Sequence, residues 1–435
     1  MTMAHDDYSL RRLPDEARTS WFSVAVQRFG QVSAFHQFLL GATLGFGMTF
    51  WDAVLAITLG SVMLEVVTIL MGIAGVRESV STSVLARWTG FGARGSALVG
   101  LLVTLSLAGW FGVQNDVFAH GLRTLMGGPP VWVWAVIGGV AVTAIVVAGF
   151  HTMAWTAYLT VPAFLLLTAW TIVSELSRHD VAHLVDMPAP GPALSLAQGT
   201  TLVAGAFIMG AVMTPDMTRF NRRPSDVVKQ TLISVTLGEY LIGLTGVLLA
   251  HAARSADVVA VIMSNSGVIG TLIMVAAILK INDWNLYSAS LGLVNTVDVL
   301  LRKQIGRSGA TMWLGALGTL LSALGILEHF TAFLTWIGVI TPPVAGIMIA
   351  EYFVVRTWRA QLDESRAAGE LPGDPPDWVP VSLVCWVAGA AVGFLVPVGI
   401  PTINSVVAAF ALYAVVGRTA GITRPVPGSR VDTHR

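Results

Sequence analysis

VAAILKINDWNLYSAS, residues 275–290, is the stretch around which the rest of the chain is organised. It lies inside a long apolar run, yet it carries Lys280, Asn282, Asp283 and Asn285. A lysine or an aspartate at bilayer depth is costly unless it faces a partner or a wet cavity. At a spacing of three residues on a helix, Lys280 and Asp283 can reach each other, and so can the two asparagines. The stretch therefore predicts a membrane helix that lines a buried polar site.

The composition of the whole chain is that of a polytopic membrane protein. Of its 435 residues, 54% are hydrophobic and 11% are charged, and the mean hydropathy is +0.73. Soluble domains carry roughly 25% charged residues. The formal net charge of +0 provides no basic field for a nucleic-acid partner. The single cysteine, Cys385, cannot form an intramolecular disulfide and is expected to pack in an apolar run.

Apolar runs of roughly 20 residues, the length that spans a bilayer, recur twelve times. We place them at 24–47, 52–75, 96–121, 130–150, 153–175, 197–217, 229–252, 259–296, 309–326, 329–354, 379–398 and 401–418. The polar intervals divide the chain into a tail (1–20), a ten-helix core (21–355), a linker (356–377), two accessory helices (378–418) and a second tail (419–435). The first tail has no signal-peptide core, so we expect the first helix to act as an uncleaved insertion signal.

The basic residues set the expected orientation. Twenty of the 25 Lys and Arg residues fall on the side of the membrane that holds both termini, and three fall on the opposite side. Because Lys and Arg concentrate in cytoplasmic loops, we expect both termini in the cytoplasm of a multi-pass protein of the inner (plasma) membrane. The same bias supports an even number of spans.

Two spans contain glycines at related places. The first span holds the polar stretch GQVSAFHQ (30–37), and the sixth holds GAFIMGA (205–211). Broken helices at matching places in two halves are typical of secondary transporters with a midplane site. The two spans are five apart, which predicts a five-plus-five repeat followed by two extra helices. Glycines in membrane helices also serve close helix packing, and the glycines alone leave that alternative open.

Six blocks follow one another along most of the chain. They are GATLGFGMTFWDA (41–53), LARWTGFGARGS (85–96), GWFGVQNDVFA (109–119), GAFIMGAVMTPDMTRFNR (205–222), NDWNLYSASLGLVN (282–295) and TPPVAGIMIAEY (341–352). The ordered set resembles the nucleobase:cation symporter-1 family, most of all its bacterial cytosine permeases. The resemblance implies an all-α membrane protein with twelve helices and the inverted-repeat fold of sodium-coupled amino-acid transporters. It also implies a bundle of helices 1, 2, 6 and 7 and a site between helices 1, 3, 6 and 8.

The resemblance further implies a substrate site with two aromatic walls. In such transporters a ring on helix 3 stacks on the flat substrate, and it matches Trp110; a second ring on helix 6 matches Phe207. Stacking between two rings suits a planar nitrogen heterocycle, which also needs a few fixed hydrogen-bond partners. Gln114 lies one turn after Trp110, and an amide at this position also occurs in the hydantoin-transporting branch of the family. Ala206 stands where cytosine permeases tend to have a hydroxyl residue. Both departures weaken cytosine as the specific substrate and leave the class, a small planar nucleobase or a relative of one, intact.

Five more positions complete the predicted substrate contacts. They are Asn282, Asp283 and Asn285 on helix 8 and Gly30 and Ser33 in the first helix. Each polar candidate has a purely structural alternative. An asparagine can brace neighbouring helices, as Gln114 also can, and Asp283 can serve only as the partner of a lysine.

Helix 8 departs from the family's sodium site. Aligned on Asn282 and Asp283, the paired hydroxyl positions fall on Lys280 and Ile281, and a preceding oxygen ligand falls on Ala277. An ammonium has donors and no acceptor, so it would repel a cation. We therefore predict that Lys280 replaces sodium, makes transport sodium-independent and, by reversible protonation with Asp283 beside it, couples transport to protons. The alternative is a permanent Lys280–Asp283 pair without a role in coupling.

Other intramembrane polar residues leave their roles open. Asp116, Glu65 and His36 fit either helix packing or a proton path, and Asp216 is expected to cap a helix or to pair with a nearby arginine. The sequence contains no cysteine–histidine cluster at metal-ligand spacing, no Walker motif and no GxSxG motif. It predicts no enzyme and no cofactor.

The function predicted from the sequence is secondary-active import of a nucleobase-like heterocycle by alternating access. Thr341-Pro342-Pro343 in the tenth span is expected to bend as a gate. Importers of hydantoin, allantoin or a thiamine-pyrimidine precursor are alternatives, and so is a sensor that binds substrate without moving it. The oligomeric state is left open.

Overall fold

The structure is a computed structural model that describes residues 12–32, 35–148, 180–373 and 375–419, with residues 166, 169–170, 173–174 and 177–178 between them. These residues form helices and connecting turns, and no strand occurs among them. The α-helices are α1 (Trp21–Val32), α2 (Phe35–Gly47), α3 (Phe50–Glu78), α4 (Thr82–Ala86), α5 (Gly92–Met126), α6 (Val131–Ala148), α8 (Val181–Asp186), α9 (Leu196–Val212), α10 (Thr214–Thr218), α11 (Pro224–Gly238), α12 (Leu244–Ala253), α13 (Val258–Leu301), α14 (Arg307–Ala323), α15 (Phe330–Ile340), α16 (Pro342–Ile349), α17 (Arg359–Ala368), α18 (Pro380–Leu395) and α19 (Pro401–Thr419).

Short helical segments of other types join several of these helices. Two are 3-10 helices, η1 (Asp15–Ala17) and η4 (Ile326–His329), and three are π-helices, η2 (Arg87–Phe91), η3 (Glu239–Gly243) and η5 (Ala350–Val355). A π-turn inside a membrane helix shifts the register of side chains, and such turns occur often at functional sites.

Seven helical segments of the described chain are long and apolar enough to cross a membrane. They are Phe50–Glu78, Thr82–Met126, Val131–Ala148, Pro224–Ala253, Gly267–Leu301, Ile326–Val355 and Pro401–Arg418. Two shorter apolar helices, α9 and α18, coincide with predicted spans as well. The predicted fifth span, 153–175, lies largely outside the described residues, so the number twelve stays a prediction. The predicted linker 356–377 contains helix α17.

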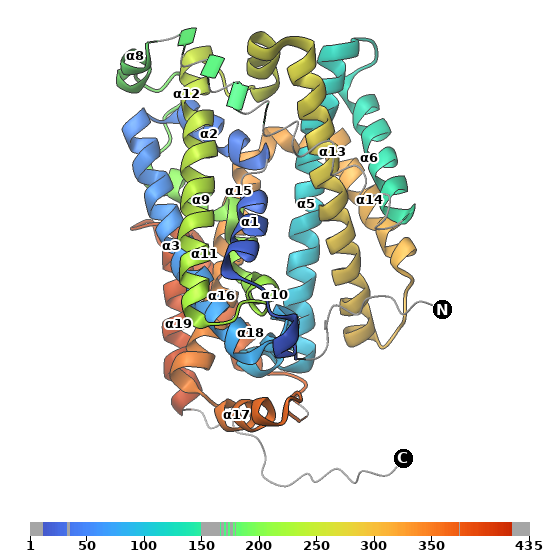
Figure 1. Cartoon of the computed structure of the whole chain (residues 1–435), viewed down its shortest axis with the longest axis vertical. Coiled ribbons are helices and arrows are strands. Elements are labelled where there is room, and N and C mark those ends of the chain that lie inside the picture. The colour runs from blue at the N-terminus through green and yellow to red at the C-terminus, as the bar shows by residue number, and fades with distance from the viewer. Residues whose placement is uncertain are drawn as a thin grey trace.

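The helices form two packed groups (Figure 1). Helix α13 lies along α5, and α6 and α14 pack beside this pair. In the other group α3 packs against α9, α12 against α2, and α1 against α11. Helix α15 contacts α9, while α18 and α19 pack together against α16. A site between helices 1, 3, 6 and 8 of the predicted scheme would therefore lie where α2 and α9 face α5 and α13.

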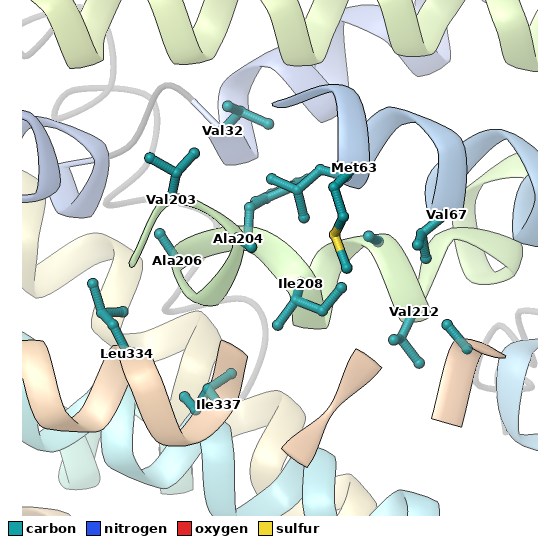
Figure 2. Close-up of a cluster of buried hydrophobic side chains, with 14 of the residues drawn as sticks. Val32, Met63, Val67, Val203, Ala204, Ala206, Ile208, Val212, Leu334 and Ile337 are labelled. Atoms are coloured by element: carbon teal, nitrogen blue, oxygen red, sulfur yellow. The ribbon is translucent and has the colours of Figure 1, made fainter. Parts of the chain in front are cut away.

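Helix α9 is apolar on all sides and is buried in the centre of the protein. Figure 2 shows its Ile208 near Met63 of α3, within a buried apolar cluster to which α3, α9 and α15 all contribute. A helix without a polar face is stable only inside the protein or in a membrane. Helix α9 is thus a wall of the central region rather than a lipid-facing helix.

The predicted interruption of the sixth span at 205–211 is wrong. Helix α9 continues without a break from Leu196 to Val212, and the chain leaves α-helical geometry only at Met213 (φ −81°, ψ 8°), before α10. Gly205 serves helix packing instead, since a Cβ there would collide with the backbone of Leu334 in α15. The absence of a side chain lets two backbones approach, which is the alternative that the sequence left open.

The predicted interruption of the first span stays a prediction. Helix α1 ends at Val32 and α2 begins at Phe35, and residues 33–34 between them lie outside the described part of the chain. The long α13 does contain a break that was not predicted, at Gly267 (φ 60°, ψ −156°). Glycine adopts this conformation without the steric strain of a Cβ. The helix that carries the polar stretch 275–290 therefore begins at Gly267.

Candidate substrate site

Trp110 lies in the middle of α5 and is 6% exposed. Its ring centroid is 5.1 Å from that of His36 on α2 and 5.4 Å and 6.1 Å from those of Phe333 and Phe330 on α15. The two phenylalanine contacts are edge-to-face, the arrangement that aromatic quadrupoles favour. Two helices besides its own thus hold the indole in a fixed orientation.

Close packing around Trp110 depends on the preceding residue. A Cβ at Gly109 would collide with the ring of Phe333. Glycine at 109 therefore lets α15 approach α5 beside the indole. This local reason accounts for the glycine in the GWFG block that the sequence analysis singled out.

Gln114 and Asn282 lie at one level of two facing helices. The Nδ2 atom of Asn282 on α13 donates to the carbonyl oxygen of Phe111 on α5 at 3.1 Å. A helical carbonyl points along the axis toward the residue four positions later. The Asn282 amide therefore lies near the level of Gln114, one turn after Trp110.

Three of the predicted substrate contacts carry a buried amide atom that has no hydrogen-bond partner among the described residues. These atoms are Oε1 of Gln114, Oδ1 of Asn282 and Nδ2 of Asn285, and the three side chains are 3%, 1% and 8% exposed. A buried polar atom without a partner is destabilising by about 1–3 kcal/mol, and native proteins contain few. Two acceptors and one donor on facing helices are a set that a polar planar ligand can satisfy.

The remaining predicted residues of helix 8 are only partly described. Asp283 is fully buried on α13. Lys280 belongs to the same helix, but its side chain lies outside the described residues. The predicted Lys280–Asp283 pair and the replacement of sodium by Lys280 both stay predictions. The same holds for the two predicted contacts of the first helix, because Ser33 is not described and Gly30 is placed only as part of α1.

Phe207 and Ala206 lie on the buried helix α9 and are 5% and 6% exposed. The ring of Phe207 lies against Gly210, and the guanidinium carbon of Arg28 is 5.4 Å from its centroid. No ring contact joins Phe207 to Trp110, both of which are described. The structure therefore places one predicted wall beside His36 and the phenylalanines of α15, and the other beside Arg28.

The family of the chain follows from its sequence as a whole. A family model described as permease for cytosine/purines, uracil, thiamine, allantoin matches residues 12–417. The chain belongs to this permease family.

Curated relatives of the permease cover nearly its whole length. The cytosine permease of Escherichia coli (strain K12) is 27% identical over 411 residues, which are 92% of each chain. The hydantoin permease of Microbacterium maritypicum is 23% identical over 434 residues, covering 93% of the permease and 86% of the relative. These findings confirm the predicted nucleobase:cation symporter-1 family, and they support nucleobase-type transport by a multi-pass membrane protein rather than an enzyme.

Solved structures confirm the fold. The inward-facing conformation of Mhp1 matches the permease with a TM-score of 0.80 at 19% identity, over 98% of the permease and 96% of Mhp1. Mhp1, a nucleobase-cation-symport-1 family transporter, in a closed conformation with bromovinylhydantoin bound, matches with a TM-score of 0.73 at 21% identity, over 96% of each chain. The predicted inverted-repeat architecture is thus that of the permease.

Arg28 is a buried residue of the permease to which the sequence analysis assigned no role. It is fully buried on α1, and its Nη2 donates to Oγ1 of Thr214 (2.8 Å), to the carbonyl oxygen of Gly210 (3.1 Å) and to Oγ1 of Thr68 (3.3 Å). It thereby ties α1 to α3 and to both sides of the α9–α10 junction. In the sequence, a lone arginine inside an apolar run was the feature that could have identified Arg28 as a buried residue with partners.

Glu239 is a second residue that the sequence analysis missed. It begins the π-helix η3, is fully buried, and accepts a hydrogen bond from the amide of Gln37 on α2. One turn earlier, Thr236 donates to Glu65 of α3 at 2.6 Å. An acid within the seventh apolar run was again the signal. Both carboxyl groups thus lie inside the helical group of the permease that contains α2 and α3.

Asp116 and Asp216 both have structural partners. Asp116 accepts from the backbone N–H of Leu327 at 3.0 Å and lies 3.2 Å from Nδ1 of His120. Asp216 accepts from the backbone N–H of Thr82 at 2.8 Å. The first contact links α5 to η4 and favours the packing alternative for Asp116, and the second agrees with the capping role expected of Asp216. Among the described residues, no group of three His, Cys, Asp or Glu side chains is placed to hold a metal ion.

Proposed function

We propose that the permease imports a nucleobase or a related planar nitrogen heterocycle, such as cytosine or a hydantoin, by alternating access. The observation that carries the proposal is the set of unpartnered amide atoms of Gln114 on α5 and of Asn282 and Asn285 on α13, with the buried Trp110 one turn before Gln114. A nucleobase supplies N–H donors and carbonyl acceptors at the edge of a flat ring. It can therefore stack on the indole and satisfy the amides in one pose.

The remaining predicted contacts belong to this proposal. Phe207 and Ala206 form the α9 wall, and Asp283 lies on the same helix as the two asparagines. Gly30 and Ser33 contribute from the first helix. The relatives named as cytosine and hydantoin permeases support the substrate class. Hydantoin transport is the second candidate, and Gln114 favours it because the hydantoin-transporting branch carries an amide at that position.

Uptake into proteoliposomes tests the proposal. Radiolabelled cytosine, uracil, hypoxanthine, allantoin and hydantoin are offered in turn, each with an imposed proton or sodium gradient. We expect accumulation of at least one of these compounds above the level in protein-free liposomes. Binding without accumulation would support a sensor instead, and neither binding nor accumulation would overturn the substrate class.

The coupling part of the proposal rests on Lys280 and Asp283. We propose that the ammonium of Lys280 stands where sodium binds in sodium-coupled relatives, and that its reversible protonation couples uptake to protons. Lys280→Met is expected to retain substrate binding and to lose proton-driven accumulation. Accumulation driven by sodium in the wild type, or undiminished proton-driven accumulation in Lys280→Met, would contradict this part alone.

We also propose that both termini lie in the cytoplasm. The distribution of Lys and Arg residues supports this orientation. The single cysteine allows a direct test, because Cys385→Ser gives a background without thiols. A cysteine introduced at Ser20 should then react with a membrane-impermeant maleimide only in inverted vesicles. Reaction in right-side-out cells would reverse the assignment.

A further inference from the structure

A cavity of about 350 Å³ opens to solvent at the end of the molecule that holds α17 (Figure 1). Five of its seven lining residues are arginines; the lining consists of Arg18, Arg77, Arg222, Arg359 and Arg366, with Val76 and Pro224. Its volume is within the range of small-molecule sites, roughly 300–1,000 Å³. No acidic side chain belongs to the described lining.

The arginines come from four separate parts of the chain. Arg18 precedes α1, Arg77 lies in the last turn of α3, Arg222 lies between α10 and α11, and α17 carries Arg359 and Arg366. Helix α3 and the segment beginning at α11 are both long and apolar enough to cross a membrane. The cavity therefore lies at the level where these spans leave the bilayer, on the side that the predicted orientation assigns to the cytoplasm.

Three of the arginines are held in place by neighbouring groups. Arg18 donates to the carbonyl oxygen of Asn221 and to Oγ of Ser79, each at 2.8 Å. Arg366 donates to Glu78 at 2.9 Å, and Arg359 donates to Asp363 at 3.1 Å. Guanidinium groups that are fixed in this way lose little conformational freedom when a ligand binds.

The charge of the cavity is not cancelled by these partners. The carboxylates in contact with the five arginines are Asp15, Asp363 and Glu78, and Arg12 shares Glu78. Arg77 and Arg222 are exposed, and neither has an ion-pair or hydrogen-bond partner among the described residues. Two guanidinium groups are thus available to a ligand, in a site that keeps a positive charge.

We propose that this cavity binds a phosphate-bearing anion, supplied either by the headgroup of an anionic phospholipid or by a free phosphate compound. The planar guanidinium fork binds phosphate oxygens through paired hydrogen bonds. Basic pockets between helices at the cytoplasmic membrane surface bind anionic headgroups. A phosphate bound there would connect the end of α3 and the α10–α11 link to α17. This proposal does not depend on the substrate site or on the coupling residues.

The test compares two charge-matched double variants of the purified full-length permease. Arg77→Gln/Arg222→Gln removes the two available guanidinium groups, and Arg302→Gln/Lys303→Gln removes two exposed cations after α13, outside the cavity. Short-chain phosphatidylglycerol and short-chain phosphatidylcholine are titrated in one arm, and inorganic phosphate and pyrophosphate in the other. Binding is read by calorimetry and by native mass spectrometry.

We expect the wild type and the control variant to bind phosphatidylglycerol in preference to phosphatidylcholine, and the cavity variant to bind it roughly 30-fold more weakly, at about fivefold for each arginine near an anionic headgroup. If pyrophosphate binds with the same dependence on the two arginines and phosphatidylglycerol does not, the site stands and its ligand is a free phosphate compound.

Equal affinity of all three proteins for every phosphate species, or no binding at all, would overturn the proposal. Arg77→Lys/Arg222→Lys keeps the charge without the fork, and we expect it to restore part of the affinity. Size-exclusion profiles identify any variant that has failed to fold, and the lysine variant then replaces the glutamine variant in the comparison.

Discussion

Two buried polar regions of the permease differ in how completely their hydrogen bonds are made. At the α17 end, the fully buried Glu78 accepts from Tyr352 (2.6 Å) and Arg366 (2.9 Å) through one oxygen and from Arg12 (3.1 Å) through the other. Beside Trp110, by contrast, the amide atoms described above have no partner. A carboxylate with both oxygens bonded has no need of a ligand, whereas a buried amide atom without a partner remains destabilising until a ligand bonds to it.

This difference indicates that the Glu78 cluster stabilises the fold and that the unpartnered amides bind a ligand. Arg12 also donates to Oγ of Ser365 at 2.8 Å and to the backbone of α17 and Glu370, so the Glu78 cluster joins the N-terminal segment, α3 and α17. Burial lowers the pKa of the Arg12 guanidinium, and the nearby Glu78 carboxylate opposes that shift. Arginine still keeps its charge at neutral pH, so the pairing persists.

The largest effect is expected from removing the centre of the saturated cluster. Glu78→Ala leaves Arg12 buried without its carboxylate and should destabilise the protein by roughly 3 kcal/mol. Thermal unfolding of the purified protein measures the change. Asp363→Asn is the matched control, because this carboxylate is 44% exposed and its pairs with arginines should contribute less than about 1 kcal/mol. Equal unfolding temperatures for the two variants would contradict the comparison.

The next effect concerns the aromatic wall of the unsaturated region. Trp110→Leu keeps an apolar side chain but removes the π-face, and substrate affinity should fall roughly 10-fold to 100-fold, the range for loss of one base-stacking contact. Equilibrium binding of the radiolabelled substrate measures it. Phe118→Leu, at a buried position of the same helix that packs against Gly138, should leave affinity unchanged. A similar loss in both variants would assign Trp110 to packing.

The smallest effect separates two adjacent amides. Gln114→Ala should weaken substrate binding roughly 10-fold, the value of one hydrogen bond, without loss of thermal stability, because it removes an unpartnered atom. Asn115→Ala should do the reverse, since its Nδ2 donates to the carbonyl oxygen of Ala135 (2.8 Å) and to Oγ of Ser322 (3.0 Å). Substrate binding and thermal unfolding are measured for both variants. Loss of stability in Gln114→Ala together with loss of affinity in Asn115→Ala would refute the role of Gln114 in binding.

The sequence predicted the class of fold because its evidence is local. Twenty apolar residues in a row span a bilayer whatever surrounds them, and the ordered blocks identified the family that the whole-chain match confirms. Polar residues inside apolar runs also predicted correctly that Gln114, Asn282 and Asn285 are buried. The same local evidence predicted a break inside α9 that does not exist, because a glycine at 205 looks the same in the sequence whether it breaks a helix or admits a neighbouring backbone.

Partners that are distant in sequence explain what local evidence missed. Arg28 reaches Thr214, 186 residues away, and Glu239 meets Gln37, 202 residues away. Each residue stood out as a charged residue in an apolar run, yet no neighbouring residue in the sequence indicated its hydrogen-bond partner. The cavity lined by five arginines has the same origin, because four separate segments contribute to it.

Gln114 and Asn115 show how far prediction from the sequence reaches before the tertiary structure is needed. From the sequence alone they are two neighbouring amides on one membrane helix, with the same chemistry and the same cost of burial. The Nδ2 atom of Asn115 is bonded to Ala135 and Ser322, which lie 20 and 207 residues away, whereas its Oδ1 has no described partner. Gln114 faces a region in which no described residue reaches its Oε1. The sequence determined that these amides are buried in a membrane transporter, and only the packing of distant helices decided that Asn115 braces α6 and α14 through its Nδ2.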